Sequence, residues 1–429
     1  MNQTNMTVTT RRGFLRAAAM SLGFPAILRA RSISPSSKIT VAAIGTGPQG
    51  LRTLANFLSN EDFQVIAVCD VSAEHRATAI AKVRERYGKP CQEHADFREV
   101  LAREDIDSVL IAIGERWHAP MSILAARAGK DIYCEKPASL AVNEMFALRD
   151  AVRKHKVVYQ CGTQRRSQWT YRYAVDLARS GKLGKLHTLY AHTSPYGWNP
   201  NLPPARPLPP KDQLDWDLWL GPSPHFDYNE TLIKGGWRGF KGLADCGIEE
   251  IGAHGTDLCQ FARDADNTMP IHYRLAGGLV TAEYADGMKM PFVQPPNNQK
   301  HKAAVAARFD GEDGWFYVDD DGHIEASNEA LVKDFRLTRT SNWQDLRNWV
   351  NHVGDFAKAV RQRSLPVSHI EATTRSIITC HLGGLVHQTG VDIQWDPATE
   401  CLVGDLTAAS LLSRAYREPW DKLVPLQAS

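Results

Sequence analysis

The sequence predicts an α/β protein with an N-terminal doubly wound parallel sheet and a C-terminal α+β domain whose sheet is open and mostly antiparallel. Three observations support this. Apolar strands alternate with helical segments between Lys38 and about Gly162, and a glycine-rich turn follows the first strand. Beyond Gly162 the pattern changes to strands joined by hairpin turns. A chain of 429 residues is also too long for one ordinary domain, so we expect two.

The first strand and its turn form the most informative stretch. Ile39–Ile44 is a short, β-branched apolar run, and Leu51–Leu58 has helical character. Between them, Gly45, Gly47 and Gly50 have G-x-G-x-x-G spacing, which provides a tight turn, close approach of a pyrophosphate and close packing of helix on strand. The helix N-terminus offers free N–H groups to phosphates. We therefore expect the turn to bind a dinucleotide through Gly45, Thr46, Gly47, Pro48, Gln49 and Gly50.

A carboxylate follows at the position that this interpretation requires. Phe63–Cys69 is a second predicted strand, and Asp70 ends it, 20 positions after Gly50. An acidic residue there accepts hydrogen bonds from a ribose 2′-OH. It also repels a 2′-phosphate, which favours NAD over NADP, although Arg76 nearby weakens that preference. The alternative is a glycine-rich turn without a ligand, and the placement of Asp70 argues against it.

The remaining N-terminal segments continue the alternation. Helices are expected at Ala73–Tyr87, His118–Ala128 and Ser139–His155, and strands at Ser108–Ile113, Asp131–Cys134 and Val157–Cys161. Strands that alternate with helices imply right-handed βαβ units. The domain boundaries expected are 1–36 for a signal peptide and linker, 37–162 for a doubly wound nucleotide-binding domain, and 163–429 for the second domain.

The C-terminal domain shows a different pattern. Ser167–Ser180 is a predicted helix, and Lys185–Ser194 is a predicted strand. The span from Ile271 to Ala326 contains several antiparallel strands, with turns at Asp286-Gly287 and Asp320-Asp321-Gly322. Helices are predicted again at Asp345–Arg363 and Glu371–Gly390.

The N-terminus is predicted to lie outside the fold. Thr10-Arg11-Arg12-Gly13-Phe14-Leu15-Arg16 and the apolar run Ala17–Leu28 resemble a Tat export signal, which implies a periplasmic or otherwise exported protein. The run is too short to anchor the protein in a bilayer.

Charge and composition limit the kinds of partner and ligand that we expect. The net charge is +2 and no polybasic run occurs, so we expect no nucleic-acid partner. The eight cysteines include no C-x-x-C pair, so we interpret all of them as reduced and structural. His381 and His387 are six apart on one predicted helix, which does not suit a metal pair.

A lysine is expected at the end of the dinucleotide cleft where the nicotinamide would lie. Glu135-Lys136-Pro137 closes the strand Asp131–Cys134, and ligands of open parallel sheets bind beyond the carboxyl ends of strands. Pro137 restricts the backbone of Lys136 and can form a cis bond. The alternative is a surface Glu-Lys pair at a strand end.

Together, the glycine turn, the E-K-P strand end and a downstream histidine motif resemble the Gfo/Idh/MocA family of nicotinamide-dependent oxidoreductases, in particular its Tat-exported bacterial branch. Further matching segments are Gly162–Arg166, Leu214–Pro222, Gly236–Phe240 and Arg417–Trp420. The resemblance implies a Rossmann domain, a substrate domain, bound NAD(P), a small carbohydrate substrate, frequent homo-oligomers and no metal.

The resemblance also implies catalytic residues. The family motif D-x-x-x-H matches Glu250 to His254, so His254 takes the place of the acid/base histidine and Glu250 stands where aspartate is usual. Positions i and i+4 share a helix face, so we expect these two side chains in the cleft. We expect Lys136 or His254 to remove a hydroxyl proton while hydride leaves the same carbon.

The other candidate residues border these motifs. Trp117, His118 and Glu135 follow the ends of strands and are expected in the cofactor pocket, together with Lys136. Arg165, Trp237, Arg238 and Asp257 are expected to contact the substrate.

The expected activity is oxidation of a sugar, glycoside or polyol, and two alternatives stay open. One is a redox-neutral glycosidase, which oxidises a sugar carbon transiently. Known α-N-acetylgalactosaminidase-like members carry Y-P-T-H where this chain has Ile251-Gly252-Ala253-His254. The other is a non-catalytic relative, against which the glycine turn, Lys136 and His254 argue.

Overall fold

The structure is a computed structural model that describes residues 37–194, 197–245, 247–294, 303–338, 350–404 and 409–424. The predicted export signal lies outside these residues. Within them, no helix combines the length and the apolar character that crossing a membrane requires.

The N-terminal half is a six-stranded sheet with the order β3-β2-β1-β4-β5-β6, in which every adjacent pair is parallel. Its strands are β1 Ile39–Ile44, β2 Phe63–Cys69, β3 Gln92–His94, β4 Ser108–Ile111, β5 Asp131–Cys134 and β6 Tyr159–Cys161. The doubly wound parallel sheet is therefore confirmed. The sequence interpretation missed β3, a short edge strand whose residues Gln92-Glu93-His94 are polar and exposed or half-buried.

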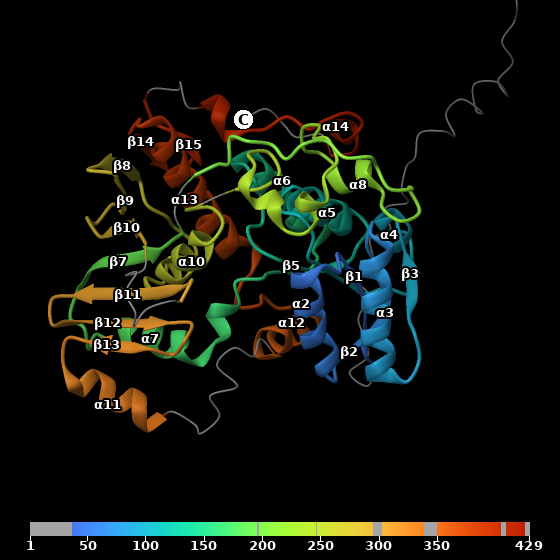
Figure 1. Ribbon diagram of the computed structural model, residues 1–429. Helices are drawn as coiled ribbons and strands as arrows, with labels where there is room; N and C mark the ends of the chain where they lie inside the picture. Colours follow the sequence, from blue (N-terminus) through green and yellow to red (C-terminus); the bar gives the residue numbers. More distant parts are fainter. Residues whose placement is uncertain are drawn as a thin grey trace, which may run out of the picture.

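Helices connect these strands on the right of Figure 1. They are α2 Pro48–Ser59, α3 Ala73–Tyr87, α4 Phe97–Leu101, α5 His118–Arg127 and α6 Val142–His155. Ser72 caps α3 with its side chain, and left-handed Gly88 ends it. The short helix α4 was also missed by the sequence interpretation.

The C-terminal half contains a nine-stranded sheet with the order β13-β12-β11-β7-β10-β9-β8-β14-β15. Only the β10–β7 pair is parallel among the described pairs, so the mostly antiparallel sheet is confirmed. Both predicted hairpin turns are present, at Gly287 and Gly322, each with positive φ. The strands are β7 Leu186–His192, β8 His272–Ala276, β9 Leu279–Glu283, β10 Lys289–Val293, β11 Ala306–Gly311, β12 Gly314–Asp319, β13 Ile324–Ala326, β14 Ile393–Asp396 and β15 Cys401–Leu402.

The helices α7 Trp169–Arg179, α10 Gly252–Ala262 and α13 Ile370–Thr389 pack against this sheet. The nearly fully buried helix α13 also contacts α6, so it joins the two halves. A further helix, α11 Glu329–Thr338, packs beside β13.

One C-terminal helix returns to the N-terminal half. Helix α12, Val350–Gln362, packs against α2, and its Phe356 lies among Phe57, Phe63 and Tyr133 with ring centroids 6.0–6.3 Å apart. The apolar cluster under the first sheet is therefore completed by residues some 190 positions beyond β6. A boundary at residue 162 separates the two sheets. It assigns α12 to the C-terminal domain, although α12 packs against the N-terminal one.

The seven cysteines that the structure describes are free thiols, as predicted for them. Cys246 lies outside the described residues.

Candidate functional site

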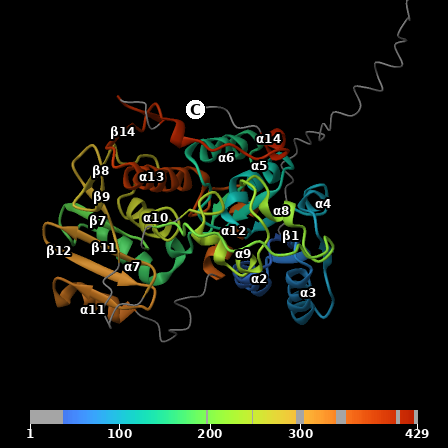
Figure 2. The same cartoon turned by 45° about the horizontal axis from the view of Figure 1, so that its top comes forward.

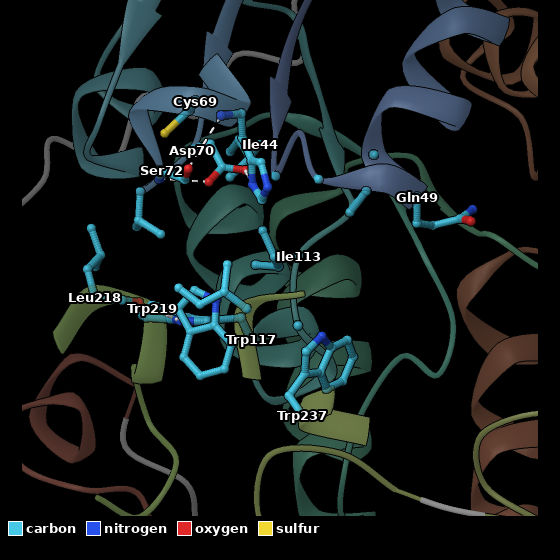
Figure 3. A pocket seen from close by; sticks show the side chains of 18 of the residues that line it. Ile44, Gln49, Cys69, Asp70, Ser72, Ile113, Trp117, Leu218, Trp219 and Trp237 are labelled. Atoms are coloured by element: carbon cyan, nitrogen blue, oxygen red, sulfur yellow. Dashed lines mark hydrogen bonds and ion pairs between the residues drawn. The ribbon is translucent and has the colours of Figure 1, made fainter. Parts of the chain in front are cut away.

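The first cavity has a volume of about 320 Å³ and lies at the carboxyl ends of β1, β2 and β4. Ile44, the glycine turn and Asp70 contribute to its wall from the Rossmann half. Leu218, Trp219 and Trp237 contribute from the C-terminal half (Figure 3). The sheet edge and the turn thus form the site expected for a dinucleotide.

The glycines fit that ligand. Gly45 has φ +86°, and a Cβ there would lie 2.5 Å from the carbonyl oxygen of Ala112. A Cβ on Gly50 would collide with the carbonyl oxygen of Gly45. In contrast, a Cβ on Gly47 would meet only the His75 ring, 3.5 Å away. Helix α2 begins at Pro48 with no side-chain cap, so its first N–H groups are available to an anion.

Asp70 lies in this cavity, where the sequence places it. Its Oδ2 accepts hydrogen bonds from the Thr46 amide at 2.7 Å and lies 3.4 Å from His75 Nδ1, and its Oδ1 accepts from the Ser72 amide. The hydrogen bond to Asp70 raises the pKa of His75, a lining residue that the sequence interpretation missed. Arg76 donates to the carbonyl oxygen of Asp70 and pairs with Glu93 at 3.5 Å.

Trp117 and His118 have different surroundings. Trp117 lines the first cavity, and its indole N–H donates to the carbonyl oxygen of Leu218 at 3.0 Å. His118 borders a second cavity instead, with ring nitrogens 2.6 Å from the carbonyl oxygen of Pro137 and 3.1 Å from that of Ile113. Burial lowers the pKa of His118 to about 4. The neutral ring has a single N–H, so it donates a hydrogen bond to one of these two carbonyl oxygens.

A segment that we name the strap, residues 213–240, crosses the first cavity. It contains α8 Trp216–Leu220 and α9 Glu230–Ile233, which lie on the Rossmann side of the molecule (Figure 2). The strap has a small apolar core of its own, made of Leu214, Trp216, Leu220, Leu232 and Phe240 together with Leu243 just beyond it.

Both sides of the cavity hold the strap. On one side, the Ala73 amide donates to the carbonyl oxygen of Gln213 at 2.9 Å, close to Asp70. On the other side, the Arg116 guanidinium donates hydrogen bonds to the carbonyl oxygen of Trp219, and its Nε lies 3.0 Å from that oxygen. The Cζ atom of Arg116 lies 3.8 Å from the centroid of the Trp219 ring. Arg116 is 2% exposed, and its Nη1 has no hydrogen-bond partner among the described residues.

The second cavity adjoins the first and measures about 220 Å³. The two share Gln49, Ala112, Ile113, Trp237 and Arg238 in their walls. The second cavity brings together most of the predicted catalytic and substrate residues: Lys136, Arg165, Trp237, Arg238, Glu250 and His254. Glu135, which was expected in the cofactor pocket, also lines this second cavity and not the first.

Lys136 pairs with Glu250 at the centre of this cavity. Its Nζ lies 3.1 Å from Glu250 Oε1 and donates to the Glu250 carbonyl oxygen at 2.9 Å. Lys136 and Arg238 lower the pKa of Glu250, against the effect of burial. The Lys136–Pro137 bond is cis.

Glu250 and His254 both line the second cavity, as expected, but they are not positions i and i+4 of one helix. Helix α10 begins only at Gly252, so Glu250 lies in the preceding turn. The turn is closed by a hydrogen bond from the Gly252 amide to the carbonyl oxygen of Gly247. The Glu250 carboxylate is directed to Lys136, whereas His254 hydrogen bonds to Arg165.

His254 is 5% exposed and contacts a guanidinium group. Its Nε2 lies 2.8 Å from Arg165 Nη1, and Arg165 forms a bidentate ion pair with Asp320. Burial, Arg165 and Lys136 together lower the pKa of His254 well below its usual value. The sequence interpretation missed Asp320, which lies 155 residues from Arg165.

Glu135 and Asp257 are both buried acids with contrasting positions. Glu135 lines the second cavity and accepts hydrogen bonds from Thr53 at 2.8 Å and Gln164 at 3.1 Å. Asp257 does not line either cavity: its carboxylate pairs with Arg166 at 2.8 Å and accepts from Ser376 at 2.9 Å. The structure thus places Asp257 in the packing between α10 and α13, which corrects its expected place at the substrate.

Glu115 also lines the second cavity, and the sequence interpretation missed it. Burial and the neighbouring Glu250 raise its pKa to about 7. Its position two residues after the predicted strand Ser108–Ile113 was a signal that could have identified it, because strand ends of this sheet meet the ligand.

Comparisons with known proteins agree with this architecture. The family model described as the NAD-binding Rossmann fold of the oxidoreductase family matches residues 39–163, and its C-terminal alpha/beta domain matches residues 193–422. A glycosyl hydrolase family 109 protein of Saccharopolyspora erythraea is 35% identical over 120 residues, 27% of this chain and 26% of that protein. An inositol 2-dehydrogenase of Salmonella typhimurium is 29% identical over 150 residues, 34% of this chain and 43% of that protein. The matched regions thus span less than half of these relatives.

Solved structures share the fold at low identity. Levoglucosan dehydrogenase, in complex with NADH and levoglucosan, gives a TM-score of 0.60 at 15% identity, over 83% of this chain and 99% of that one. GenD2 from gentamicin A biosynthesis, in complex with NAD, gives a TM-score of 0.61 at 16% identity, over 85% of this chain and 99% of that one. The chain belongs to the Gfo/Idh/MocA family of NAD(P)-dependent oxidoreductases.

Proposed function

We propose that this enzyme transfers hydride between a hydroxyl-bearing carbon of a sugar, glycoside or polyol and bound NAD. The observation that carries the proposal is the junction of the two cavities, where the dinucleotide site opens onto Lys136, Glu250 and His254. When bound, NAD supplies the hydride acceptor. The side chains of the second cavity then have to bind the substrate, orient it and move one proton.

The second cavity suits a small polyhydroxylated substrate. Trp237 offers an aromatic face, while Arg238, Glu135 and Lys136 offer donors and acceptors in a confined volume. The relative named for inositol and the neighbour named for levoglucosan act on molecules of this chemical class, which supports the proposal. The carboxylate of Asp70 and the engagement of Arg76 favour NAD over NADP.

A second candidate is a redox-neutral glycosidase that oxidises one carbon, releases the aglycone, adds water and returns the hydride. The strap favours it, because an enclosed nucleotide that returns its hydride needs no exchange within the cycle. The similarity to glycosyl hydrolase family 109 proteins is in line with it and covers about a quarter of the first of those proteins.

Mass analysis of products separates the two candidates. The full-length protein is incubated with a panel of glycosides and free sugars. A product lighter by two hydrogens supports the dehydrogenase. Free aglycone with unoxidised sugar, and no net change of nucleotide, supports the glycosidase. Unchanged substrates across a panel that includes inositols and anhydrosugars contradict both.

We also propose export through the Tat pathway, on the twin arginines Arg11 and Arg12, and a homo-oligomer, on the resemblance to the family. Replacing both arginines with lysine should retain the protein in the cytoplasm of its host. Light scattering of the purified enzyme measures the oligomer, and a monomeric mass contradicts it.

A further inference from the structure

The two ring nitrogens of His254 have different surroundings. Nε2 lies 2.8 Å from Arg165 Nη1. A guanidinium nitrogen donates hydrogen bonds and cannot accept them, so Nε2 must present its lone pair to Arg165. In the neutral ring the proton therefore resides on Nδ1.

Arg165 is itself held in place. Its Nε and Nη2 form a bidentate pair with Asp320 at 3.1 and 2.6 Å. Asp320 Oδ1 also accepts a hydrogen bond from the Tyr171 hydroxyl at 2.9 Å. Bidentate arginine–carboxylate pairs fix the plane of the guanidinium, so the direction of its bond to His254 is fixed as well.

The charges around His254 keep the ring neutral. The groups that act on it are Arg165 from the segment after β6, Lys136 from the end of β5 and His352 from α12. Arg165 is a cation throughout, Lys136 is a cation in its ammonium form, and burial lowers the pKa of His352 to about 4. Protonation of Nε2 would break the bond from Arg165 and place two cations in contact.

The Nδ1 atom is buried and has no hydrogen-bond partner among the described residues. An unsatisfied buried donor destabilises the protein, so an atom of a bound ligand is the natural acceptor at this position. His254 lines the second cavity, in which we place the substrate.

We infer that Arg165 is a positioning residue which, held by Asp320, fixes His254 as the neutral Nδ1–H tautomer, so that His254 donates a hydrogen bond in the reaction and Lys136 takes the proton. This inference rests on the proposed function. The substrate hydroxyl gives its proton to the amine form of Lys136, which becomes the ammonium that pairs with Glu250. NAD, which the glycine turn and Asp70 would hold, would supply the hydride acceptor for the same carbon, and His254 keeps its proton throughout.

The tautomer can be measured without turnover. Long-range ¹H–¹⁵N spectra of the full-length, histidine-labelled enzyme report each ring, and His254→Gln identifies the signals of His254. We expect a protonated Nδ1 and an unprotonated Nε2 from pH 6 to pH 8. A protonated Nε2, or a charged ring at pH 7, would overturn the inference.

Substitution of Arg165 tests the cause. In Arg165→Met we expect a mixture of tautomers and a His254 pKa raised toward the ordinary value of about 6.5. Arg165→Lys, which keeps a cation and a donor, should stay close to wild type. Arg52 lines the same cavity but contacts Gln49, so Arg52→Met serves as the control. It also removes a guanidinium group from this cavity, and it should leave the tautomer of His254 unchanged.

The double variant Arg165→Met/Asp320→Asn covers the case in which an unpaired Asp320 prevents folding. It removes both charges and should give the same tautomer mixture. Spectra of this variant or of Arg165→Met that are identical to wild type would overturn the role of Arg165.

Kinetics then test the direction of proton transfer. On a substrate identified by product analysis, His254→Gln keeps a donor and should lower turnover by about tenfold, the worth of one weakened hydrogen bond. Lys136→Met should lower it by about 10²–10⁴-fold. Equal losses of turnover in the two variants would indicate that His254, and not Lys136, is the base. Absence of turnover on every substrate would count against the proposed function, while the spectra would still decide the tautomer.

Discussion

The two adjoining cavities differ in how they are built. The dinucleotide cavity is formed mainly by backbone and by apolar or aromatic side chains, including three glycines, the first turn of α2, Trp117 and parts of the strap, with Asp70, His75 and Arg116 as polar exceptions. The second cavity is formed by side chains that carry or exchange protons, namely Lys136, Glu115, Glu250, Arg165 and His254. Ligand binding in the first cavity therefore depends mainly on shape, and the chemistry of the second cavity depends on charge. We expect substitutions in the first cavity to change nucleotide occupancy and substitutions in the second to change the rate of the reaction.

The sharpest test of this contrast is Lys136→Met. We expect turnover to fall by about 10²–10⁴-fold while the nucleotide stays bound, because Lys136 contacts Glu250 and not the glycine turn. Steady-state kinetics and the nucleotide content of the purified protein are measured together. A variant that lost nucleotide as well would show that the two cavities are not separable.

Gly50→Ala tests the other cavity. A Cβ at this position collides with the carbonyl oxygen of Gly45, so α2 must move away from β1. Overpacking of this kind usually destabilises by about 1–3 kcal/mol, and we expect nucleotide affinity to fall by about tenfold to a hundredfold. Titration with NAD and thermal unfolding measure the two effects.

The control for Gly50→Ala is Gly197→Ala, an exposed position at which a new Cβ meets no atom within 4 Å. It should leave both affinity and stability unchanged. Normal NAD affinity in Gly50→Ala would contradict the shape-based account of the first cavity.

Glu115 makes the stability of the charged cavity depend on pH. Burial and Glu250 raise its folded pKa to about 7 from an ordinary value near 4.5. The unfolded chain thus releases this proton more readily, so stability is lost as pH rises from about 4.5 through 7. Glu115→Gln should match wild type near pH 4.5 and exceed it at pH 8, by an amount on the order of 2–3 kcal/mol.

Urea unfolding at pH 5 and pH 8 measures this difference. Glu85 is exposed on α3, so Glu85→Gln should change stability equally at both values. An advantage of Glu115→Gln that was equal at the two pH values would contradict a titrating Glu115.

The same contrast explains what the sequence could predict. The glycine turn, Asp70 and Glu135-Lys136-Pro137 are local patterns, since neighbours in sequence meet at strand ends of one parallel sheet. The structure places the three glycines, Pro48, Gln49, Asp70, Glu135 and Lys136 in the walls of the two cavities, whereas Thr46 and Pro137 line neither. Strands β1, β2 and β5 have the predicted bounds because their apolar runs are short and end abruptly.

Features that depend on distant segments were not predictable. Asp320 reaches Arg165 from the turn between β12 and β13, and α12 packs on α2 from nearly 300 residues away. No periodicity links such pairs. Asp257 was misplaced because a motif position does not reveal the direction of a side chain: on α10 it points to Arg166 and Ser376.

The smallest effect is expected at the strap. Arg116→Met removes the hydrogen bonds from its guanidinium to the carbonyl oxygen of Trp219 and the stacking on the Trp219 ring, but leaves the glycine turn intact. A strap that opens more readily should release NAD faster, by about tenfold for a loss near 1.4 kcal/mol.

Stopped-flow displacement of NADH fluorescence measures that rate. Arg153→Met is a suitable control, because Arg153 pairs with Glu371 away from the first cavity and the strap and should not alter the rate. Faster release with unchanged product chemistry would show that the strap acts on occupancy alone, in line with the division between the two cavities. Unchanged release would mean that the anchorage at Ala73 and Trp117 is sufficient, because those hydrogen bonds fasten the strap on both sides without Arg116.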